Sequence, residues 1–186
     1  MIIDCLCTQP AGIRDQAAVL LSDHFDEPSG WPDVQAGRTE VDDVCRDGFL
    51  LGAIDDVTLL GLVGGLPEYD GRVWELHPLV VRREARLQGI GRRLVEAFEA
   101  EVQRRGGLTM TLGTDDDSGM TSLSGVDLYD DVPGHVAGLR DLGRRHPFLF
   151  YRKLGWVVTG VVPDANGRGF PDIYMSKPVP DDDGEA

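Results

Sequence analysis

The sequence lacks several features that would place it in common functional classes. No apolar run approaches the roughly 20 residues that a helix needs to cross a bilayer, and the first residues, Met1–Asp4, carry no basic region of a secretory signal. It has no Gly-Lys pair, which a P-loop requires, and no internal repeat. We therefore expect a soluble, cytoplasmic protein without a membrane partner.

Cysteine is scarce as well. The three cysteines cannot all pair, because their number is odd. Cys5 and Cys7 lie two apart, on what reads as one face of a strand, and no Cys/His ligand set stands near them. We expect free thiols rather than a disulfide, and we expect no metal site.

Positive charge is in deficit. The chain has 18 Lys and Arg against 32 Asp and Glu, a formal net charge of −14. Nucleic acids are bound mainly through Lys and Arg, so this balance argues against a nucleic-acid partner and favours a cationic one. With 186 residues and 41% apolar content, the chain is long enough for one core.

The charges are unevenly distributed. One group of arginines surrounds a glycine turn, and a later stretch between Gly106 and Leu139 has no Lys or Arg. The arginines are Arg82, Arg83, Arg86, Arg92 and Arg93, and the acidic stretch holds Asp115, Asp116, Asp117, Asp127, Asp130 and Asp131. This pattern indicates a bipolar site for an anionic cofactor and a cationic substrate, although a solvated acidic loop would look the same.

Hydrophobic periodicity predicts an α+β or α/β chain with a mixed, mostly antiparallel sheet flanked by helices. We expect one domain over 1–179 and an acidic, disordered tail over 180–186. Thr39, with Asp42 three residues later, predicts the start of a short helix after a loop over 26–38. Strands are expected over 2–6, 49–54, 58–66, 73–81, 108–112, 157–162 and 172–177, and further helices over 11–25, 90–105 and 147–154.

The most informative stretch is Arg86–Gly91, which reads R-x-x-G-x-G between the strand over 73–81 and the helix over 90–105. A strand that ends in such a turn directs free N–H groups and the positive end of a helix dipole at one spot. A dinucleotide-binding turn would need a third glycine where Leu94 stands. The turn predicts a pyrophosphate cradle, although glycines before a helix are also common in plain turns.

In this order of elements, the chain resembles the GCN5-related N-acetyltransferases (GNAT), and within them the aminoglycoside 6′-N-acetyltransferases. The resemblance implies a single GNAT domain whose sheet is splayed between its fourth and fifth strands, with acetyl-CoA as co-substrate and a homodimer as the assembly. The matching stretches, in chain order, are Trp74–Val81, Gly106–Thr109, Leu112–Asp116, Asp127–Tyr129, His146–Phe148, Phe150–Gly155, Pro163–Gly167 and Pro171–Ile173.

The resemblance also implies site residues. The amide of Leu79 would polarise the acetyl carbonyl, and Tyr151 would face the sulfur of coenzyme A and protonate it. Glu75 and His77, two apart on one strand face, are candidates for accepting the ammonium proton, with Glu75 preferred. The residues expected to bind the cofactor are Leu79, Val81, Arg86, Leu87, Gln88, Gly89, Ile90, Gly91, Arg92 and Tyr151.

An aminoglycoside carries several ammonium groups, so its pocket should be lined by carboxylates and a few flat walls. Asp115 and Asp116 are the best candidates, beside Glu75 and His77. Lesser candidates are Asp172, Glu27, Trp31 and Asp33, and the remaining histidines, His24, His135 and His146, are expected to be structural.

We therefore expect acetyl transfer from acetyl-CoA to the 6′-amino group of aminoglycoside antibiotics, by direct attack in a ternary complex, as a resistance function. An acidic pocket accepts any cation, so a polyamine or a protein amine is the alternative acceptor. A catalytically silent sensor that binds coenzyme A is a third possibility. The run Thr121–Leu142 has more apolar residues than a free loop needs, which supports the expected homodimer.

Overall fold

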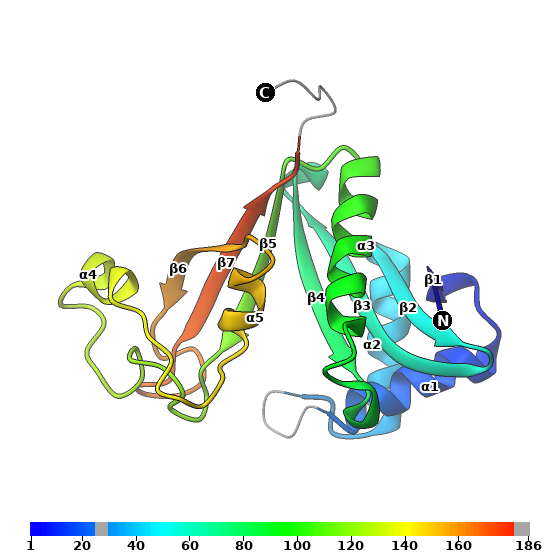
Figure 1. The fold of residues 1–186 in the computed structure, drawn as a ribbon, viewed down its shortest axis with the longest axis horizontal. Coiled ribbons are helices and arrows are strands. Elements are labelled where there is room, and N and C mark those ends of the chain that lie inside the picture. The colour runs from blue at the N-terminus through cyan, green and yellow to red at the C-terminus, as the bar shows by residue number, and fades with distance from the viewer. Residues whose placement is uncertain (25–29, 181–186) are drawn as a thin grey trace. The chain divides into compact units, whose positions relative to one another are not determined.

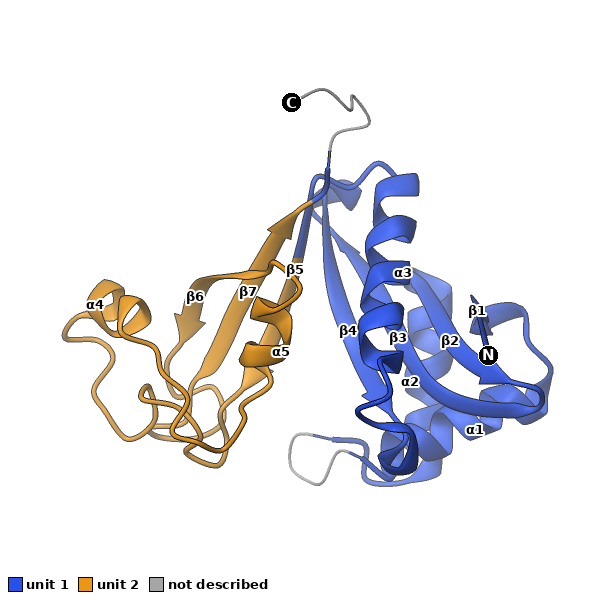
Figure 2. Ribbon diagram, in the orientation of Figure 1, with its two compact units in different colours: residues 1–110, 179–186 blue, residues 111–178 orange. Residues whose placement is uncertain are grey.

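The structure is a computed structural model that describes residues 1–24 and 30–180. Glu27, expected at the substrate site, and the tail residues 181–186 lie outside the described residues. The chain divides into two compact units, one of residues 1–110 with the chain end from Val179, and one of residues 111–178 (Figure 2). Each unit is described by itself.

The described strands form one seven-stranded sheet in the order β1-β2-β3-β4-β5-β7-β6 (Figure 1). The first four strands are antiparallel neighbours, as are β6 and β7, whereas β5 runs parallel to β4. The predicted mixed, mostly antiparallel GNAT sheet is thus confirmed. The strands are β1 (Ile2–Cys5), β2 (Phe49–Asp55), β3 (Thr58–Glu68), β4 (Val73–Val81), β5 (Thr109–Asp115), β6 (Val157–Val162) and β7 (Asp172–Pro178).

The helices lie close to where periodicity places them, except that α2 begins earlier and one helix is added. The α-helices are α1 (Ala11–Ser22), α2 (Val34–Asp47), α3 (Ile90–Arg104), α4 (Val132–Ala137) and α5 (Phe148–Arg152). Short 3-10 helices cover η1 (Leu6–Thr8), η2 (Tyr69–Gly71) and η3 (Arg83–Ala85). The added helix is α4, whose Asp131 accepts a hydrogen bond from the Gly134 N–H, and which the sequence patterns do not predict.

The sheet of the first unit is covered on both faces. α1 and α2 pack on one face around a buried cluster that includes Leu20, Val44 and Leu62. α3 packs on the other, where the Phe49 ring lies 5.7 Å from the ring of Phe98 and 5.4 Å from that of Trp74. We call these the α1–α2 face and the α3 face. Because strand residues alternate between faces, each strand supplies both cores.

β4 carries a β-bulge at His77–Pro78. Between the pairs Leu76–Gly65 and Leu79–Val63, β4 has two residues and β3 has one. The single β3 residue is a glycine, and a Cβ added to it would collide with the carbonyl oxygen of His77. The bulge therefore depends on a close approach of two backbones.

The bulge reverses the alternation of side chains along β4. Before it, Trp74 lies on the α3 face, in contact with Phe49. After it, Val80 belongs to the core of the α1–α2 face. The odd-numbered residues change in the other direction, from the α1–α2 face to the α3 face. Glu75 and His77 therefore lie on the α1–α2 face, and Leu79 and Val81 lie on the α3 face.

The start of α2 differs from the prediction. The helix begins at Val34, inside the segment expected to be a loop, because the carboxylate of Asp33 accepts a hydrogen bond of 2.8 Å from the Ala36 N–H. The hydroxyl of Thr39, expected to cap the helix, instead donates to the Gln35 carbonyl one turn earlier. The prediction chose Thr39 as the N-cap, whereas Asp33, which comes earlier in the sequence, is the N-cap of α2.

The cysteine prediction is wrong for two of the three residues. Cys7 and Cys45 form a disulfide with a Cα–Cα distance of 5.4 Å, and Cys5 is the free cysteine. Cys5 ends β1 while Cys7 lies in η1, so the two do not share a strand face. The pairing joins the start of the chain to α2 across 38 residues, a long-range contact that local spacing does not reveal.

In the second unit, the run Thr121–Leu142 packs on its own chain. Leu123, Leu128 and Leu139 are buried within it. Most of the apolar content that pointed to a dimer is therefore explained without a partner. Leu142 remains exposed.

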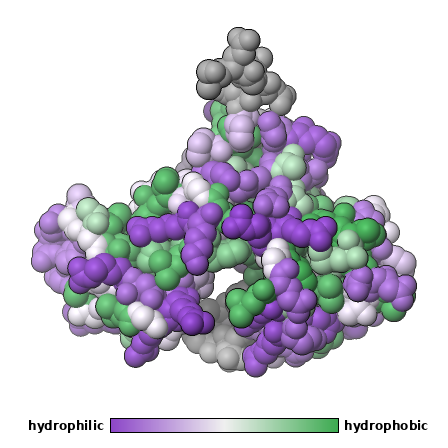
Figure 3. Space-filling model, in the orientation of Figure 1, coloured by the Kyte–Doolittle hydropathy of each residue, from purple (hydrophilic) through white to green (hydrophobic). Residues whose placement is uncertain are grey.

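Hydrophilic residues cover much of the face seen in Figure 3, as a charged fraction of 27% leads one to expect, with hydrophobic patches between them. Among the described residues, no helix combines the length and apolar character that crossing a bilayer requires.

Candidate functional site

A cluster of four side chains lies on the α1–α2 face of the first unit. Glu75 and His77 come from β4, Glu40 from the middle of α2, and Trp31 from the segment before α2. Glu40 Oε1 lies 3.3 Å from His77 Nε2, and Glu40 Oε2 accepts a hydrogen bond of 3.1 Å from Trp31 Nε1. The Trp31 and His77 rings are 5.9 Å apart at an angle of 50°. We call these residues the acceptor cluster.

The position of Glu40 follows from how α2 packs. Gly37 lies against Ala18 of α1 so closely that a Cβ would collide with the Ala18 carbonyl oxygen. Val41 and Val44 of α2 are buried in the core. Glu40 stands one turn after the glycine contact, at the margin of the buried face, with 23% of its side chain exposed.

The three ionisable groups of the cluster perturb one another. Burial raises the pKa of Glu75 above its ordinary value, an effect that Glu68 adds to and the nearby His77 opposes. Burial alone would lower the pKa of His77, but the hydrogen bond and charge of Glu40, with the charge of Glu75, raise it overall. The hydrogen bond from His77 lowers the pKa of Glu40 despite its burial. At neutral pH Glu40 is therefore the firmly ionised member.

The backbone of β4 beyond the bulge presents N–H groups away from β3. Arg82 N–H donates to the Leu60 carbonyl of β3 at 2.9 Å. In an antiparallel ladder, every second residue directs its backbone N–H and C=O groups at the partner strand, so the N–H of Val80, like that of Arg82, points toward β3. The N–H groups of Leu79 and Val81 therefore point to the other side.

The turn from β4 to α3 has the predicted form. Gly89 takes a left-handed φ of 82° directly before α3, and a Cβ there would meet nothing within 4 Å. The first backbone bond of the helix runs from Arg93 N–H to the Gly89 carbonyl at 3.1 Å. The N–H groups of Ile90, Gly91 and Arg92 precede that bond, so the helix start offers donors and a positive dipole end to an anion. This arrangement fits a pyrophosphate.

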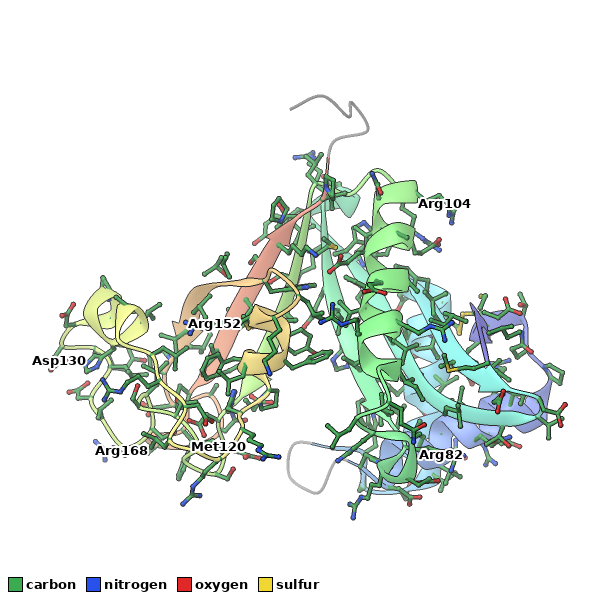
Figure 4. All side chains as sticks on the ribbon, in the orientation of Figure 1. Arg82, Arg104, Met120, Asp130, Arg152 and Arg168 are labelled. Carbon is green, nitrogen blue, oxygen red and sulfur yellow. A yellow bond between two sulfur atoms is a disulfide. The ribbon has the colours of Figure 1, made fainter. Side chains whose placement is uncertain are left out.

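The arginines around the turn also shape the backbone. Arg86 Nε donates to the Val81 carbonyl at 3.1 Å and closes the end of β4. Arg82 donates to the Leu59 carbonyl and, at 3.2 Å, to Gln16 Oε1. Figure 4 labels Arg82 near the start of α3 and Arg104 near its end. Arg86 therefore has a structural contact in addition to the cofactor role predicted for it.

Tyr151 belongs to α5 in the second unit. The residue is 8% exposed, and its ring packs against those of Phe150 and Trp156, at centroid distances of 5.1 and 5.8 Å. Burial raises the pKa of its hydroxyl. The group therefore keeps its proton at neutral pH, which a proton donor requires.

The acidic pair after β5 is divided between two environments. Asp115 is exposed, and its carboxylate accepts a hydrogen bond of 2.6 Å from Asn166 Nδ2. Asp116 is fully buried and accepts bonds from the Met120 and Thr121 N–H groups and the Ser124 hydroxyl. Met120 is labelled in Figure 4. The substrate role predicted for Asp116 does not fit this burial, because its carboxylate already holds the following loop.

The other predicted residues are placed as follows. Asp172 lies at the start of β7 against Gly113 of β5, whose added Cβ would contact its carboxylate. Asp33 is the α2 cap. His146 is buried, its Nε2 donating to the Asp115 carbonyl and its Nδ1 accepting from the Phe148 N–H, which agrees with a structural histidine.

The structure brings in two residues that the sequence reasoning did not name as site residues. They are Glu40, in the acceptor cluster, and Asn166, which holds Asp115. No local pattern marks Glu40, because its partners come from other elements. Among residues 1–24 and 30–180, no group of three or more His, Cys, Asp or Glu is placed to hold a metal ion.

Comparisons with known proteins agree with this fold. The model of the acetyltransferase (GNAT) family matches residues 18–124. A crystal structure of an aminoglycoside 6′-N-acetyltransferase complexed with coenzyme A is 40% identical, with a TM-score of 0.90, and covers 97% of this chain and 98% of that chain. Comparison with curated proteins found no match.

Two further structures are similar over the same span. The aminoglycoside 6′-N-acetyltransferase from Enterococcus faecium is 39% identical, with a TM-score of 0.89, and covers 97% of this chain and 98% of that chain. An aminoglycoside 6′-acetyltransferase type Ii is 34% identical, with a TM-score of 0.73, and covers 97% and 99%. With the family model matching more than half of its length, this chain belongs to the GNAT acetyltransferase family.

Proposed function

We propose that the protein transfers the acetyl group of acetyl-CoA to the 6′-amino group of aminoglycoside antibiotics, in a ternary complex and as a resistance function. The observation that carries the proposal is the identity of 40% over 97% of the chain with an aminoglycoside 6′-N-acetyltransferase that binds coenzyme A. The acceptor cluster agrees with it, since it contains the carboxylate of Glu75, which attracts a cationic amine.

Acetyl-CoA supplies the activated acetyl group, and the turn residues Leu87–Arg92 bind its pyrophosphate. The N–H groups at the start of α3 donate to the phosphate oxygens, while Gly89 leaves open space beside them. The N–H of Val81 points in the same direction as that of Leu79, and we assign it to the cofactor arm. Arg86 supports this binding by fixing the end of β4.

The reaction forms a C–N bond and breaks the C–S bond of the thioester. The attacking amine must lose a proton, which the carboxylate of Glu75 accepts directly or through water. The N–H of Leu79 stabilises the carbonyl oxygen as negative charge develops on it. The departing sulfur needs a proton, and the hydroxyl of Tyr151 supplies one.

We propose that the remaining ammonium groups of the drug are bound by exposed carboxylates. Asp115 is the main candidate, because its carboxylate is exposed and held in place by Asn166. Asp172, which is only partly exposed at the start of β7, is a lesser candidate. Trp31 gives the acceptor cluster a flat wall that suits the apolar face of a sugar ring.

We propose a homodimer, as its family resemblance implies. The supporting observation is β6, the last strand in the sheet order, where Val157 and Val162 are 57% and 45% exposed. Sedimentation at micromolar concentration tests it, and a monomer of 20.3 kDa alone would contradict it. We further propose that the protein works in the cytoplasm, because acetyl-CoA is available there.

The function is tested by a thiol-release assay with acetyl-CoA and a panel of 2-deoxystreptamine aminoglycosides, with spermidine and a basic peptide as competing acceptors. We expect turnover with drugs that carry a 6′-amino group, and product NMR should place the acetyl group there. Faster turnover with spermidine or the peptide would overturn the choice of acceptor. Binding of coenzyme A without release of thiol from any acceptor would overturn the enzymatic function itself.

A further inference from the structure

The acceptor cluster contains one residue for which the chemistry above has no use. Glu40 comes from α2, and each of its carboxylate oxygens is occupied, one by His77 Nε2 at 3.3 Å and the other by Trp31 Nε1 at 3.1 Å. A carboxylate that holds two side chains from two other elements has little room to bind a third group. Glu40 therefore holds the His77 and Trp31 rings from one carboxylate, and we call this arrangement the clamp.

We propose that Glu40 is the positioning residue of the acceptor site: its two oxygens hold the His77 imidazole and the Trp31 indole in fixed places and leave Glu75 as the group that takes up the amine proton. The kinetic part of this inference rests on the proposed acetyl transfer. The pairing itself does not.

The first step of the argument concerns the orientation of His77. The ring is only half-buried, with 40% of the side chain exposed, so packing alone does not fix it. The contact with Glu40 and the tilted stacking on Trp31 each restrict the ring. Since Trp31 donates to the same carboxylate, loss of Glu40 removes one contact from each of the two rings.

The second step concerns charge. The charged groups that face His77 are Glu40 from α2 and Glu75 from β4, and Glu68 from β3 adds its charge at Glu75. Both Glu40 and Glu75 favour the protonated imidazole. The Nε2 atom of His77 is already engaged by Glu40 Oε1 at 3.3 Å, so this nitrogen is not the one that takes up the amine proton, and the Glu75 carboxylate is left for that role. Glu40 thereby separates the roles of two residues that sequence alone leaves as alternatives.

The third step concerns how α2 holds Glu40. The helix is tied to α1 by the close contact at Gly37 and to η1 by the disulfide at Cys45. Both lie on α2 and bracket Glu40 along the helix. The clamp therefore stands on a rigid support, as a positioning group requires.

The test compares Glu40→Gln with a matched control, Asp43→Asn. Both remove one carboxylate charge from α2, but Asp43 pairs with the exposed Arg46. The first measurement is the NMR titration of the His77 ring, assigned with His77→Gln. We expect the His77 pKa to fall in Glu40→Gln and to stay unchanged in Asp43→Asn.

The second measurement is steady-state kinetics with the best acceptor. Misplaced reacting groups cost rate, so Glu40→Gln should lower kcat/KM for the acceptor on the order of 10- to 100-fold. The KM for acetyl-CoA should not change. Glu40→Asp, which keeps the charge but shortens the side chain, should restore the His77 titration in part.

An unmoved His77 titration in folded Glu40→Gln would overturn the inference, and so would a moved titration with unchanged acceptor kinetics. If Glu40→Gln does not fold, Glu40→Asp and Trp31→Phe decide it, since Trp31→Phe removes one partner of the clamp and should also shift the His77 titration. If the wild-type protein acetylates no aminoglycoside, the proposed function fails, while the NMR titration still decides the pairing because it needs no substrate.

Discussion

Asp115 and Asp116 are neighbours in the chain, but one is exposed at the end of β5 and the other is fully buried. Asp115 is held by a side chain, Asn166, and Asp116 by backbone N–H groups and a hydroxyl of the loop that follows. The same substitution at the two positions should therefore have different effects.

Asp115→Asn should bind the drug more weakly and leave the fold intact. An exposed ion pair contributes up to about 1 kcal/mol, so the KM for the drug should rise about fivefold. Its dependence on salt should weaken, since the lost contact is screened over about 8 Å at physiological ionic strength. Steady-state kinetics at two salt concentrations measures both. A loss of turnover at saturating drug would instead assign the base to β5.

Asp116→Asn should destabilise the protein, because a buried acceptor of three hydrogen bonds loses its charge; the expected loss is about 2 kcal/mol or more of unfolding free energy. Burial opposes ionisation of Asp116, but the hydrogen bonds outweigh it and hold its pKa below the ordinary 3.8. The stabilisation is therefore complete above that ordinary value and disappears as pH falls through the folded pKa. Urea unfolding of the wild type and the variant at neutral and acidic pH measures this stabilisation. An equal loss of unfolding free energy at both pH values would contradict this role of Asp116.

Glu75→Gln should lower kcat with aminoglycosides on the order of 100-fold, because the amide keeps the shape of the side chain but cannot accept a proton. Burial raises the pKa of Glu75 above the ordinary 4.5. In the wild type, activity should fall as pH drops through that raised pKa, and the variant should lack this acid limb. The pH profile of kcat/KM measures it. An unchanged acid limb would point to another base.

Gly89→Asp should weaken binding of acetyl-CoA, because it places an anion in the open space beside the helix start. Gly89→Asn is the matched control, since asparagine has the same shape and also tolerates the left-handed φ of 82°. The KM for acetyl-CoA should be about tenfold or more higher in the aspartate variant than in the asparagine variant. Similar KM values for acetyl-CoA in the two variants would contradict the assignment of this turn to the pyrophosphate.

Replacing Cys7 and Cys45 together by serine should lower the unfolding free energy by about 2–4 kcal/mol, as expected for a disulfide that closes a long loop. Cys5→Ser is the control and should change stability little. Urea unfolding without reductant measures the difference. Dithiothreitol should lower the unfolding free energy of the wild type to that of the double variant. Detection of three free thiols in the native protein would show that the disulfide is absent.

Local patterns predicted most of the elements and fewer of the contacts between them. The β2–β3 hairpin and α3 were predicted well because their periodicity is contained in a few neighbouring residues. The turn at Gly89 was predicted for the same reason. The disulfide, the β4 bulge and the place of Glu40 depend on pairing between distant elements, which one sequence does not reveal.

The burial of Asp116, which the prediction missed, could have been inferred from the local sequence. Residues two apart on a strand share a face, so Asp116 continues the buried series of Leu112 and Thr114, and Asp115 points the opposite way. Alternation along β5 is therefore enough, by itself, to separate the two carboxylates. Their shared charge masked the difference.

The reversal of faces at the β4 bulge makes the two halves of the reaction separable in the chain. In the proposed reaction, residues before the bulge, with Trp31 and Glu40, belong to the acceptor side, and residues after it lead into the turn that we propose binds the cofactor. Substitutions on one half need not be transmitted through shared side-chain packing to the other. If the proposed roles hold, acceptor preference can be changed at the positions before the bulge, which are the few to randomise for a new amine, while the turn proposed to bind the cofactor is left unchanged.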